Sequence, residues 1–386
     1  KDYAYEHEGD DDYFTIHDLL CDLAEEVAGR DWFRIEKGFT GEVPPGVRYL
    51  FAGTSNMELL TEKISGLRNL RTLIIDDKIY VTSNQCKVFM SMFTMFTGLR
   101  KLRVSKLCFG EGLYTFSFPD SIGNLKHLRY FAFLMAIKVG TKLTVPSTFT
   151  KLYHMQMLDL GYCMTLVFSG GEDMMNPVNL RHLISLNDVD FPNVGKLIWL
   201  QKLQSFGIRK EQGYEAHQLK HLNRLQGKLQ ISGLEDVGSK EEAVEANLVG
   251  KEKLTELELK WDLEESCSPE VQAEVLEGLC PSKYLEILYI SQYHGMRLPN
   301  WMMGKHNGGP KNLQELKLGG WVQLGPAPDL EAFIHLHSLD FFNCSWDSLA
   351  GNMEHLTSLK KLHLRRCMNM QSLGTLPKSL EEFEVK

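Results

Sequence analysis

Apolar residues recur along this chain in short clusters with the spacing L-x-x-L-x-L, in which aliphatic or aromatic residues occupy the L positions. Clear examples are "LRKLRVSKL", "LTELELKW", "LQELKLGG" and "LKKLHLRRC". The central apolar positions lie 21 to 31 residues apart at Leu73, Leu102, Phe131, Leu158, Leu183, Phe206, Leu229, Leu257, Leu288, Leu316, Leu339, Leu362 and Phe383. Apolar and polar residues alternate within each cluster, which predicts a short β-strand with one buried face.

This period is typical of leucine-rich repeats, in which each unit contributes one strand and a returning segment. A single unit cannot bury its apolar face, so stacked units build one continuous core. The predicted fold class is therefore an α/β repeat, a horseshoe-shaped leucine-rich-repeat solenoid with parallel strands on its concave face. The weaker copy "VRYLFA" around Leu50 is the candidate first coil.

Helical patterns occur at the start of the chain and in two insertions. Residues 12–29 carry apolar side chains on one helical face and end at a glycine, which predicts an amphipathic helix. Residues 268–279 and 239–248 each begin with a serine that can cap a helix, and we expect both helices on the outer side of the solenoid. The segment 36–47, with three glycines and two prolines, is the predicted junction between these parts.

Composition limits the classes of protein that fit this sequence. The chain is 43% hydrophobic and 24% charged, has a formal net charge of −8 and lacks a long basic run, which argues against a nucleic-acid partner. The longest apolar run, residues 130–137, is far shorter than the roughly 18 residues needed to span a bilayer, so no transmembrane segment is predicted. The sequence begins without Met and without a signal peptide, and we expect it to be a piece of a longer protein.

Cysteines and catalytic motifs point away from an extracellular protein and from an enzyme. Cys163, Cys344 and Cys367 each lie five residues after a central apolar position, where the repeat consensus turns Asn or Cys inward. We therefore expect free thiols in a reducing cytoplasm. The sequence contains no G-K-[ST], H-E-x-x-H or G-x-S-x-G motif, so catalysis by this chain is not expected.

His17 stands where the predicted N-terminal helix begins, and the free N–H groups of such an end attract anions. By themselves these residues favour a histidine that only stabilises the helix end. The segment "DYFTIHDLLCDLAEEVAGRDWFRIE" resembles the end of the winged-helix part of the nucleotide-binding module in plant NLR immune receptors. The signature Met-His-Asp of that family stands here as Ile16-His17-Asp18.

Further blocks resemble the repeat region of the coiled-coil type of these receptors, in the same order. They are "FPDSIGNLKHLRYF", "GKLQISGLEDV", "EANLVGKEKLTELELKWD" and "EVLEGLCPSKYLEILYISQYHGMRLPNWM". The resemblance implies that residues 1–45 are the C-terminal part of the winged-helix subdomain and that residues 46–386 are the leucine-rich-repeat domain. It also implies that His17 contacts the β-phosphate of ADP and that Asp18 orients the loop. Because the P-loop is missing, ADP or ATP is expected only in the full-length receptor and not on this fragment alone.

The resemblance further implies a C-terminal fragment of an intracellular plant immune receptor. Its repeat domain is expected to recognise a pathogen effector or a modified host protein, and to repress the receptor's own nucleotide-binding module in cis. Oligomerisation on activation is expected through N-terminal domains missing from this chain. The expected location is the cytoplasm, with the nucleus and the inner face of the plasma membrane as further sites.

Charged and aromatic residues beside the central apolar positions form the predicted partner-binding surface, because exposed aromatics beside Arg are typical of interface hot spots. A negatively charged partner is expected there. We expect Trp261→Ala with Arg365→Glu and Arg366→Glu to leave the solenoid folded but to abolish recognition or release autoinhibition. The predicted set is Lys101, Arg103, Lys106, Arg209, Lys210, Trp261, Tyr289, Lys361, Arg365 and Arg366.

Two other functions remain open from the residues alone. One is a generic leucine-rich-repeat scaffold, such as the substrate-recognition arm of a ubiquitin ligase. The other is an enzyme that uses His17, Asp18 and Cys21 as a catalytic cluster, because Cys21 lies one helical turn after His17.

Overall fold

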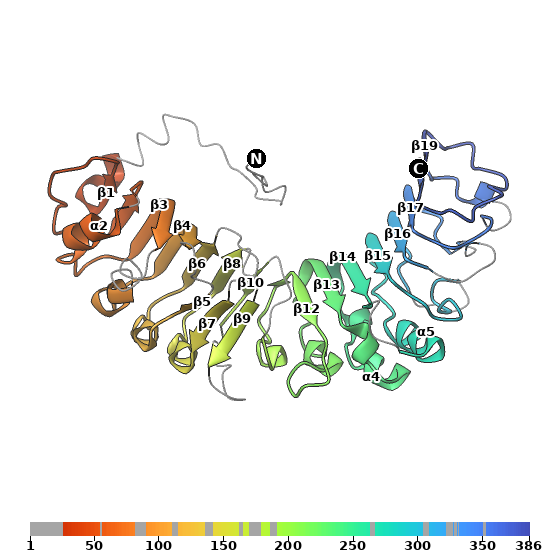
Figure 1. Ribbon diagram of the computed structural model, residues 1–386, viewed down its shortest axis with the longest axis horizontal. Helices are drawn as coiled ribbons and strands as arrows, with labels where there is room; N and C mark the ends of the chain where they lie inside the picture. The colour runs from red at the N-terminus through yellow and green to blue at the C-terminus, as the bar shows by residue number, and fades with distance from the viewer. Residues whose placement is uncertain are drawn as a thin grey trace.

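The computed structural model describes residues 26–54, 56–81, 90–109, 115–135, 142–161, 165–169, 179–185, 191–262, 267–303, 309–321, 327, 330, 332–349 and 353–386. The chain forms an open arc, with strands along its inner side and turns and short helices along its outer side (Figure 1). The predicted leucine-rich-repeat solenoid is confirmed.

Two parallel sheets of eight strands follow one another along the inner side. The first contains β1(Trp32–Ile35), β2(Tyr49–Ala52), β3(Thr72–Val81), β4(Lys101–Phe109), β6(Tyr130–Met135), β8(Met157–Gly161), β10(His182–Ile184) and β11(Lys202–Leu203). The second contains β12(Ser205–Gly207), β13(Gln226–Ser232), β14(Lys253–Lys260), β15(Ile287–Ser291), β16(Glu315–Gly319), β17(Ser338–Phe342), β18(Lys361–Arg365) and β19(Glu382–Val385). A third sheet holds β5(Thr115–Ser117), β7(Lys142–Pro146) and β9(Thr165–Ser169).

The predicted central apolar residues stack on one another in register. Leu73 pairs with Leu102 in the first sheet, and Leu257 pairs with Leu288 in the second. The same row continues through every predicted position except Phe206. Stacking in one row buries each leucine against the coils on both sides, which is why no coil is stable by itself.

Phe206 was wrongly predicted as a central position. Leu203 instead pairs with Leu183 at the end of the first sheet, and Phe206 pairs with Ile231 at the start of the second. The two sheets therefore meet within one coil. The next coil contains Gly227 at φ 73°, a left-handed conformation that glycine adopts without a steric penalty.

Short helices lie mainly on the outer side of the arc (Figure 1). Among the described residues, the α-helices are α2(Met57–Ile64), α4(Lys240–Val244) and α5(Pro269–Gly278). The helix predicted at 268–279 is confirmed, with Ser268 as its cap, whereas the helix predicted at 239–248 is limited to α4. The 3-10 turns are η1(Gly29–Asp31), η2(Asp120–Asn124), η3(Ser147–Lys151), η4(Val194–Lys196), η5(Ala216–Leu219), η6(Leu234–Asp236), η7(Leu248–Gly250) and η8(Met353–His355). None of the helices in the described ranges is both long and apolar enough to cross a bilayer.

The inner sheet begins earlier than the predicted first coil at Leu50. β1 pairs with β2 in parallel, so residues 32–35, within the range 1–45, already belong to this sheet. The predicted junction 36–47 connects two strands of the solenoid. Most of the helix predicted at 12–29 lies outside the described residues.

Aromatic side chains fill the solenoid where leucines alone do not. In the first half, the ring of Phe118 contacts Phe116 and Phe133 at centroid distances of 5.2 and 4.9 Å. In the second half, an aromatic spine runs from coil to coil through the buried Trp261, Tyr293, Trp321 and Trp346, with centroid distances of 4.6 to 5.5 Å. Such rings bury large apolar areas and so link adjacent coils.

Two of the predicted inward cysteines are confirmed. The Cys344 thiol donates to the carbonyl oxygen of Leu318 at 3.3 Å, and the Cys367 thiol donates to that of Phe341 at 3.6 Å. Each bond joins one coil to the coil before it. Cys163 lies outside the described residues.

Candidate interaction surface

The concave face consists of the strand residues that alternate with the buried leucines. Along β15, Ile287 and Tyr289 are half-buried, whereas Leu288 and Ile290 between them are buried. This period of two places one set of side chains in the core and the other on the inner surface of the arc. The character of that surface differs between the two sheets.

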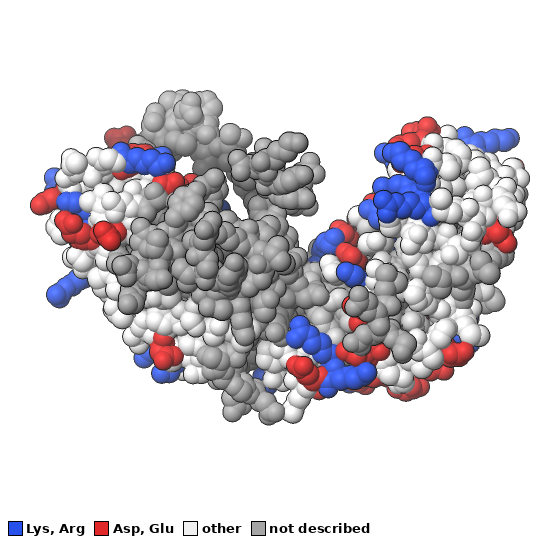
Figure 2. Space-filling model, in the orientation of Figure 1, with Lys and Arg blue, Asp and Glu red and all other residues white. Residues whose placement is uncertain are grey.

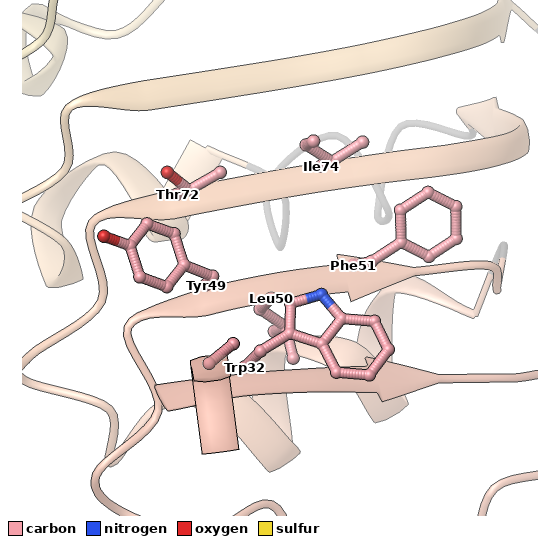
Figure 3. Close-up of a pocket in the computed structure, with 7 residues that line it drawn as sticks. Trp32, Tyr49, Leu50, Phe51, Thr72 and Ile74 are labelled. Atoms are coloured by element: carbon pink, nitrogen blue, oxygen red, sulfur yellow. The ribbon is translucent and has the colours of Figure 1, made fainter. Parts of the chain in front are cut away.

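An apolar inner patch lies at the N-terminal end of the first sheet. Trp32, Tyr49, Phe51 and Ile74 project from neighbouring strands β1, β2 and β3, and line an open hollow of about 360 Å³ (Figure 3). Tyr49 is 42% exposed, and the other three are half-buried. Because exposed, contiguous apolar surface of this kind marks interaction sites, this patch is a candidate docking surface.

Cations border this patch and stack on aromatic rings. The guanidinium of Arg34 lies 4.7 Å from the ring centroid of Phe51, and the Lys101 ammonium lies 4.6 Å from that of Tyr130. Burial, and after it the nearby charge of Arg103, lower the pKa of Lys101. These contacts combine apolar area with positive charge, as interface residues commonly do.

The second sheet instead presents a ladder of alternating charges, with Lys and Arg interspersed among Asp and Glu on the inner side of the C-terminal arm (Figure 2). Cationic and acidic side chains both occur along its strands and at the residue after β19. The members of this charge ladder are Lys228, Glu256, Glu258, Lys260, Glu315, Lys317, Asp340, Lys361, Arg365, Glu382, Glu384 and Lys386.

Most of these charges are paired with a neighbouring strand. Lys228 contacts Glu256 at 2.8 Å, and Lys361 contacts Glu382 at 3.0 Å. Arg365 pairs with Asp340, whose side chain is only 8% exposed. Of the three C-terminal cations predicted to meet a negatively charged partner, Lys361 and Arg365 are therefore each opposed by a carboxylate of an adjacent strand.

Trp261 was wrongly predicted to be exposed. It is 1% exposed and packs edge-on against Tyr293 at 5.3 Å. It lies four residues after Leu257, so strand alternation gives it the same inward direction as that leucine. Its role is packing between coils.

Three other predicted residues lie where expected, on the inner face. Lys101 and Arg103 are half-buried on β4, and Tyr289 stands on β15 between Glu258 and Lys317 of the adjacent strands. Burial, and after it the charge of Glu258, raise the pKa of Tyr289. Lys106 also belongs to β4, but its side chain lies outside the described set.

The remaining predicted cations belong to other environments. Arg209 stacks 5.0 Å from the ring centroid of Tyr214 after β12, and Lys210 contacts Asp236 at 3.2 Å. Arg366 follows β18 at φ 56°, with its guanidinium 5.4 Å from the ring centroid of Phe342. The predicted set thus spans both sheets and does not form one cluster.

His17 and Asp18 lie outside the described residues, so their nucleotide contacts remain a prediction. The sequence interpretation also missed the apolar inner patch, because β1 lacks the L-x-x-L-x-L spacing. Its signal was strand alternation in "WFRI", where Phe33 and Ile35 face the core side. That pattern covers only four residues. The two that alternate with Phe33 and Ile35 are the apolar Trp32 and the charged Arg34, so this face of the strand has no uniform polarity.

Comparisons with known proteins agree with this architecture. Residues 216–344 match the family model of R13L1/DRL21 leucine-rich repeats. A disease resistance protein of Arabidopsis thaliana is 30% identical over 348 residues, covering 86% of this chain and 24% of the relative. The disease resistance protein RGA1 of Solanum bulbocastanum is 33% identical over 186 residues, covering 47% of this chain and 18% of the relative. The chain belongs to the leucine-rich-repeat regions of plant disease resistance proteins.

A solved structure supports the fold of this disease-resistance repeat region. A TDR receptor superposes with a TM-score of 0.50 at 15% identity, covering 92% of this chain and 67% of that receptor. The chain spans about a quarter or less of the length of the two curated relatives named above. By its fold, the repeat region is a protein-interaction domain.

Proposed function

We propose that this chain is the recognition and repression region of an intracellular plant immune receptor. In this proposal the solenoid recognises a pathogen effector or a modified host protein. At rest it also holds the receptor's own ADP- or ATP-binding module in cis. The apolar inner patch carries the proposal for repression, because it lies on the first three strands, and the first of these belongs to the segment that resembles the end of that module.

The physical argument is that the patch needs a partner. Trp32, Phe51 and Ile74 expose apolar surface toward the hollow of the arc, where an adjacent domain can cover it. Burying apolar surface contributes about 25 cal/mol per Å², so a few hundred Å² stabilise a contact in cis by several kcal/mol. A recognised protein that displaces this contact couples recognition to the switch. The recognised protein and the nucleotide-binding module then act on the same equilibrium between the repressed and the released receptor.

The proposed test is charge insertion into the patch of the full-length receptor. Trp32→Glu with Phe51→Glu is expected to release repression and to cause cell death in leaf tissue without an effector. The matched control is Ile334→Glu with Val249→Glu, which alters two exposed side chains outside the inner strands. Equal protein accumulation must be shown by immunoblot, and a repressed patch variant at normal accumulation would contradict the proposal.

For the nucleotide switch we propose that His17 contacts the β-phosphate of ADP and that Asp18 orients the loop. The support is the motif Ile16-His17-Asp18 and the relatedness to disease resistance proteins. His17→Ala removes a hydrogen bond to a charged group, worth about 1.5 to 3 kcal/mol, which shifts the resting population toward the active state. Cell death without an effector together with reduced ADP occupancy is expected, whereas a silent variant with unchanged ADP would contradict this role.

A further inference from the structure

A cationic band runs along one side of the first half of the solenoid. Before each strand the chain makes a turn of the form L-x-x-L-x-x-L, and the x positions face solvent or lie at the surface. In the successive coils from Leu67 to Gln226 these positions hold Lys, Arg and His but no Asp or Glu. The band consists of Arg68, Arg71, Arg100, Lys101, Lys126, Arg129, Arg181, Lys202 and Arg224.

Backbone hydrogen bonds place these residues side by side. The Arg100 N–H donates to the Arg71 carbonyl at 2.7 Å, and the Arg129 N–H donates to the Arg100 carbonyl at 2.8 Å. The row continues through Gln156 to Arg181, again at 2.8 Å. The spacing between successive coils is therefore that of neighbouring strands, about 4.8 Å.

The same positions in the second half of the solenoid are different. There Lys253, Lys283 and Lys311 are accompanied by acidic residues such as Glu252 and Glu286 at equivalent positions. The absence of acid is thus a property of the first half and not of the turn. The cationic band thus carries positive charge without neighbouring acidic residues, although the whole chain has a net charge of −8.

The cations of the band have no ion-pair partner in the described part of the fold, and two of them, Lys101 and Arg224, stack on aromatic rings. Among the described residues, none of the nine lies within 4.0 Å of a carboxylate oxygen. Burial, and after it the charges of Lys202 and Arg181, lower the pKa of His182 beside them. The band therefore retains its positive charge for an external partner.

Exposed apolar side chains stand in the band at its centre. Tyr153 and Ile198 are each 49% exposed, and Trp199 is 39% exposed. The Arg224 guanidinium lies 4.1 Å from the ring centroid of Trp199. Tryptophan and tyrosine beside Lys and Arg are the side chains that favour the boundary between lipid headgroups and acyl chains.

We propose that the cationic band binds the surface of an anionic lipid bilayer, with Ile198 and Trp199 entering the headgroup layer. The solenoid curves as an open arc (Figure 1), and the backbone bonds that join Arg71, Arg100 and Arg129 run from coil to coil along it. A contiguous row of cations fits an anionic membrane surface, and each such cation near an anionic bilayer adds attraction.

Two other partners fit the band less well. A nucleic-acid strand would need free aromatic faces for base stacking, but Arg224 covers one face of Trp199 and Lys101 covers one face of Tyr130. A protein partner would be expected to meet a mixed surface, because charged residues are depleted from the core of protein interfaces. Anionic lipids move laterally and can gather under an all-cationic strip.

The test is flotation of the 386-residue chain with lipid vesicles. One set contains phosphatidylcholine alone, and the other contains about one third phosphatidylserine. Binding is expected only to the second set and is expected to weaken with salt, because the Debye length falls from about 10 Å at 0.1 M to about 3 Å at 1 M.

The decisive comparison uses two variants with the same change in net charge. Arg100→Glu/Arg129→Glu/Arg181→Glu alters the band, and its partitioning is expected to fall by about a hundredfold, at about fivefold for each cation. Lys253→Glu/Lys283→Glu/Lys311→Glu alters exposed lysines at other positions of the same turns in the second half, and its partitioning is expected to change by less than about threefold. Thermal unfolding verifies that both variants are folded. If the band variant with Glu does not fold, Arg→Gln replacements at the same three positions take its place in the comparison.

Several outcomes would overturn the proposal. Equal losses in both variants would show that only net charge matters. Equal binding to phosphatidylcholine alone would show that anionic lipid is not recognised. Tighter binding to poly(U) RNA or to an acidic polypeptide, with no flotation on phosphatidylserine vesicles, would assign the band to another class of macromolecule.

Discussion

The ammonium group of Lys251, which has no exposed surface, donates a hydrogen bond of 2.6 Å to the carbonyl oxygen of Leu219 in the preceding coil. Burial lowers the pKa of Lys251 to about 8, from an ordinary value of about 10.4. A charged amine in the core thus ties two coils together through one backbone acceptor. Such a group makes the stability of the solenoid depend on pH.

Stability is expected to rise with pH between about pH 8 and 10.4 because of Lys251. In that window the unfolded chain holds the proton more tightly than the folded chain, so loss of the proton favours the folded state. The free energy of unfolding of the native chain relative to Lys251→Met should increase by about 2 to 3 kcal/mol from pH 7 to pH 10. Urea unfolding at several pH values measures this, and the exposed Lys253→Met variant should show no such trend.

Arg365→Glu is expected to destabilise the C-terminal coils. The change removes the partner of the buried Asp340 carboxylate and adds a like charge beside it. A fully buried pair loses about 3 to 5 kcal/mol when broken; because Arg365 itself is 42% exposed, a loss of about 2 kcal/mol is expected. Thermal unfolding measures it, with Arg366→Glu as the control, since that exposed side chain should cost less than about 0.5 kcal/mol.

Trp261→Ala is expected to damage folding and not recognition alone. The substitution removes the first ring of the aromatic spine and leaves a cavity beside Tyr293. Comparable deletions of a buried Trp cost about 3 to 5 kcal/mol, whereas Trp261→Phe should cost less. Denaturant unfolding decides this, and an Ala variant of native stability with lost recognition would restore the role predicted from the sequence.

Cys367 is expected to react with iodoacetamide faster than Cys344 in the folded protein. The hydrogen bond between the two thiols is the largest cause that lowers the pKa of Cys367 to about 7, and the same bond raises that of the buried Cys344. The thiolate is the reactive form, so labelling of Cys367 should increase steeply as the pH passes 7. Peptide mass analysis gives the rates, and Cys344→Ala should slow the labelling of Cys367 at pH 7.

All eight cysteines are expected to be free thiols. The four described cysteines, at positions 267, 280, 344 and 367, form no disulfide. Alkylation of the denatured protein without prior reduction should therefore add eight groups, as it does after reduction. Two or more missing adducts would indicate native disulfides and argue against a reducing compartment.

The sequence was sufficient to predict the repeat core because its signal recurs in every coil. The central leucines stack as predicted, and Cys344 and Cys367 turn inward as the spacing indicated. The exception is Phe206. The strand register shifts by one residue between Leu203, which pairs with Leu183, and Ser205, which pairs with Gln230. The spacing of apolar residues along the sequence does not reveal this shift.

The interaction surface was predicted less well because it depends on direction and pairing, which single positions do not reveal. Alternation along β14 would have placed Trp261 in the core, as it does for Leu259. Whether Arg365 is free depends on Asp340, a residue 25 positions away that only the parallel pairing of β17 with β18 brings alongside. Local sequence carries no information on that pairing.

The meeting of two sheets within the coil that contains Leu203 and Phe206 has a mechanical consequence. Each ladder of strand hydrogen bonds transmits tension along its own length, but neither ladder crosses this coil unbroken. When the two ends of the arc are pulled apart, the separation of neighbouring coils should increase first at this coil, because the strand hydrogen bonds are interrupted there. We therefore expect the arc to widen or narrow at this coil while the strands on either side keep their hydrogen bonds.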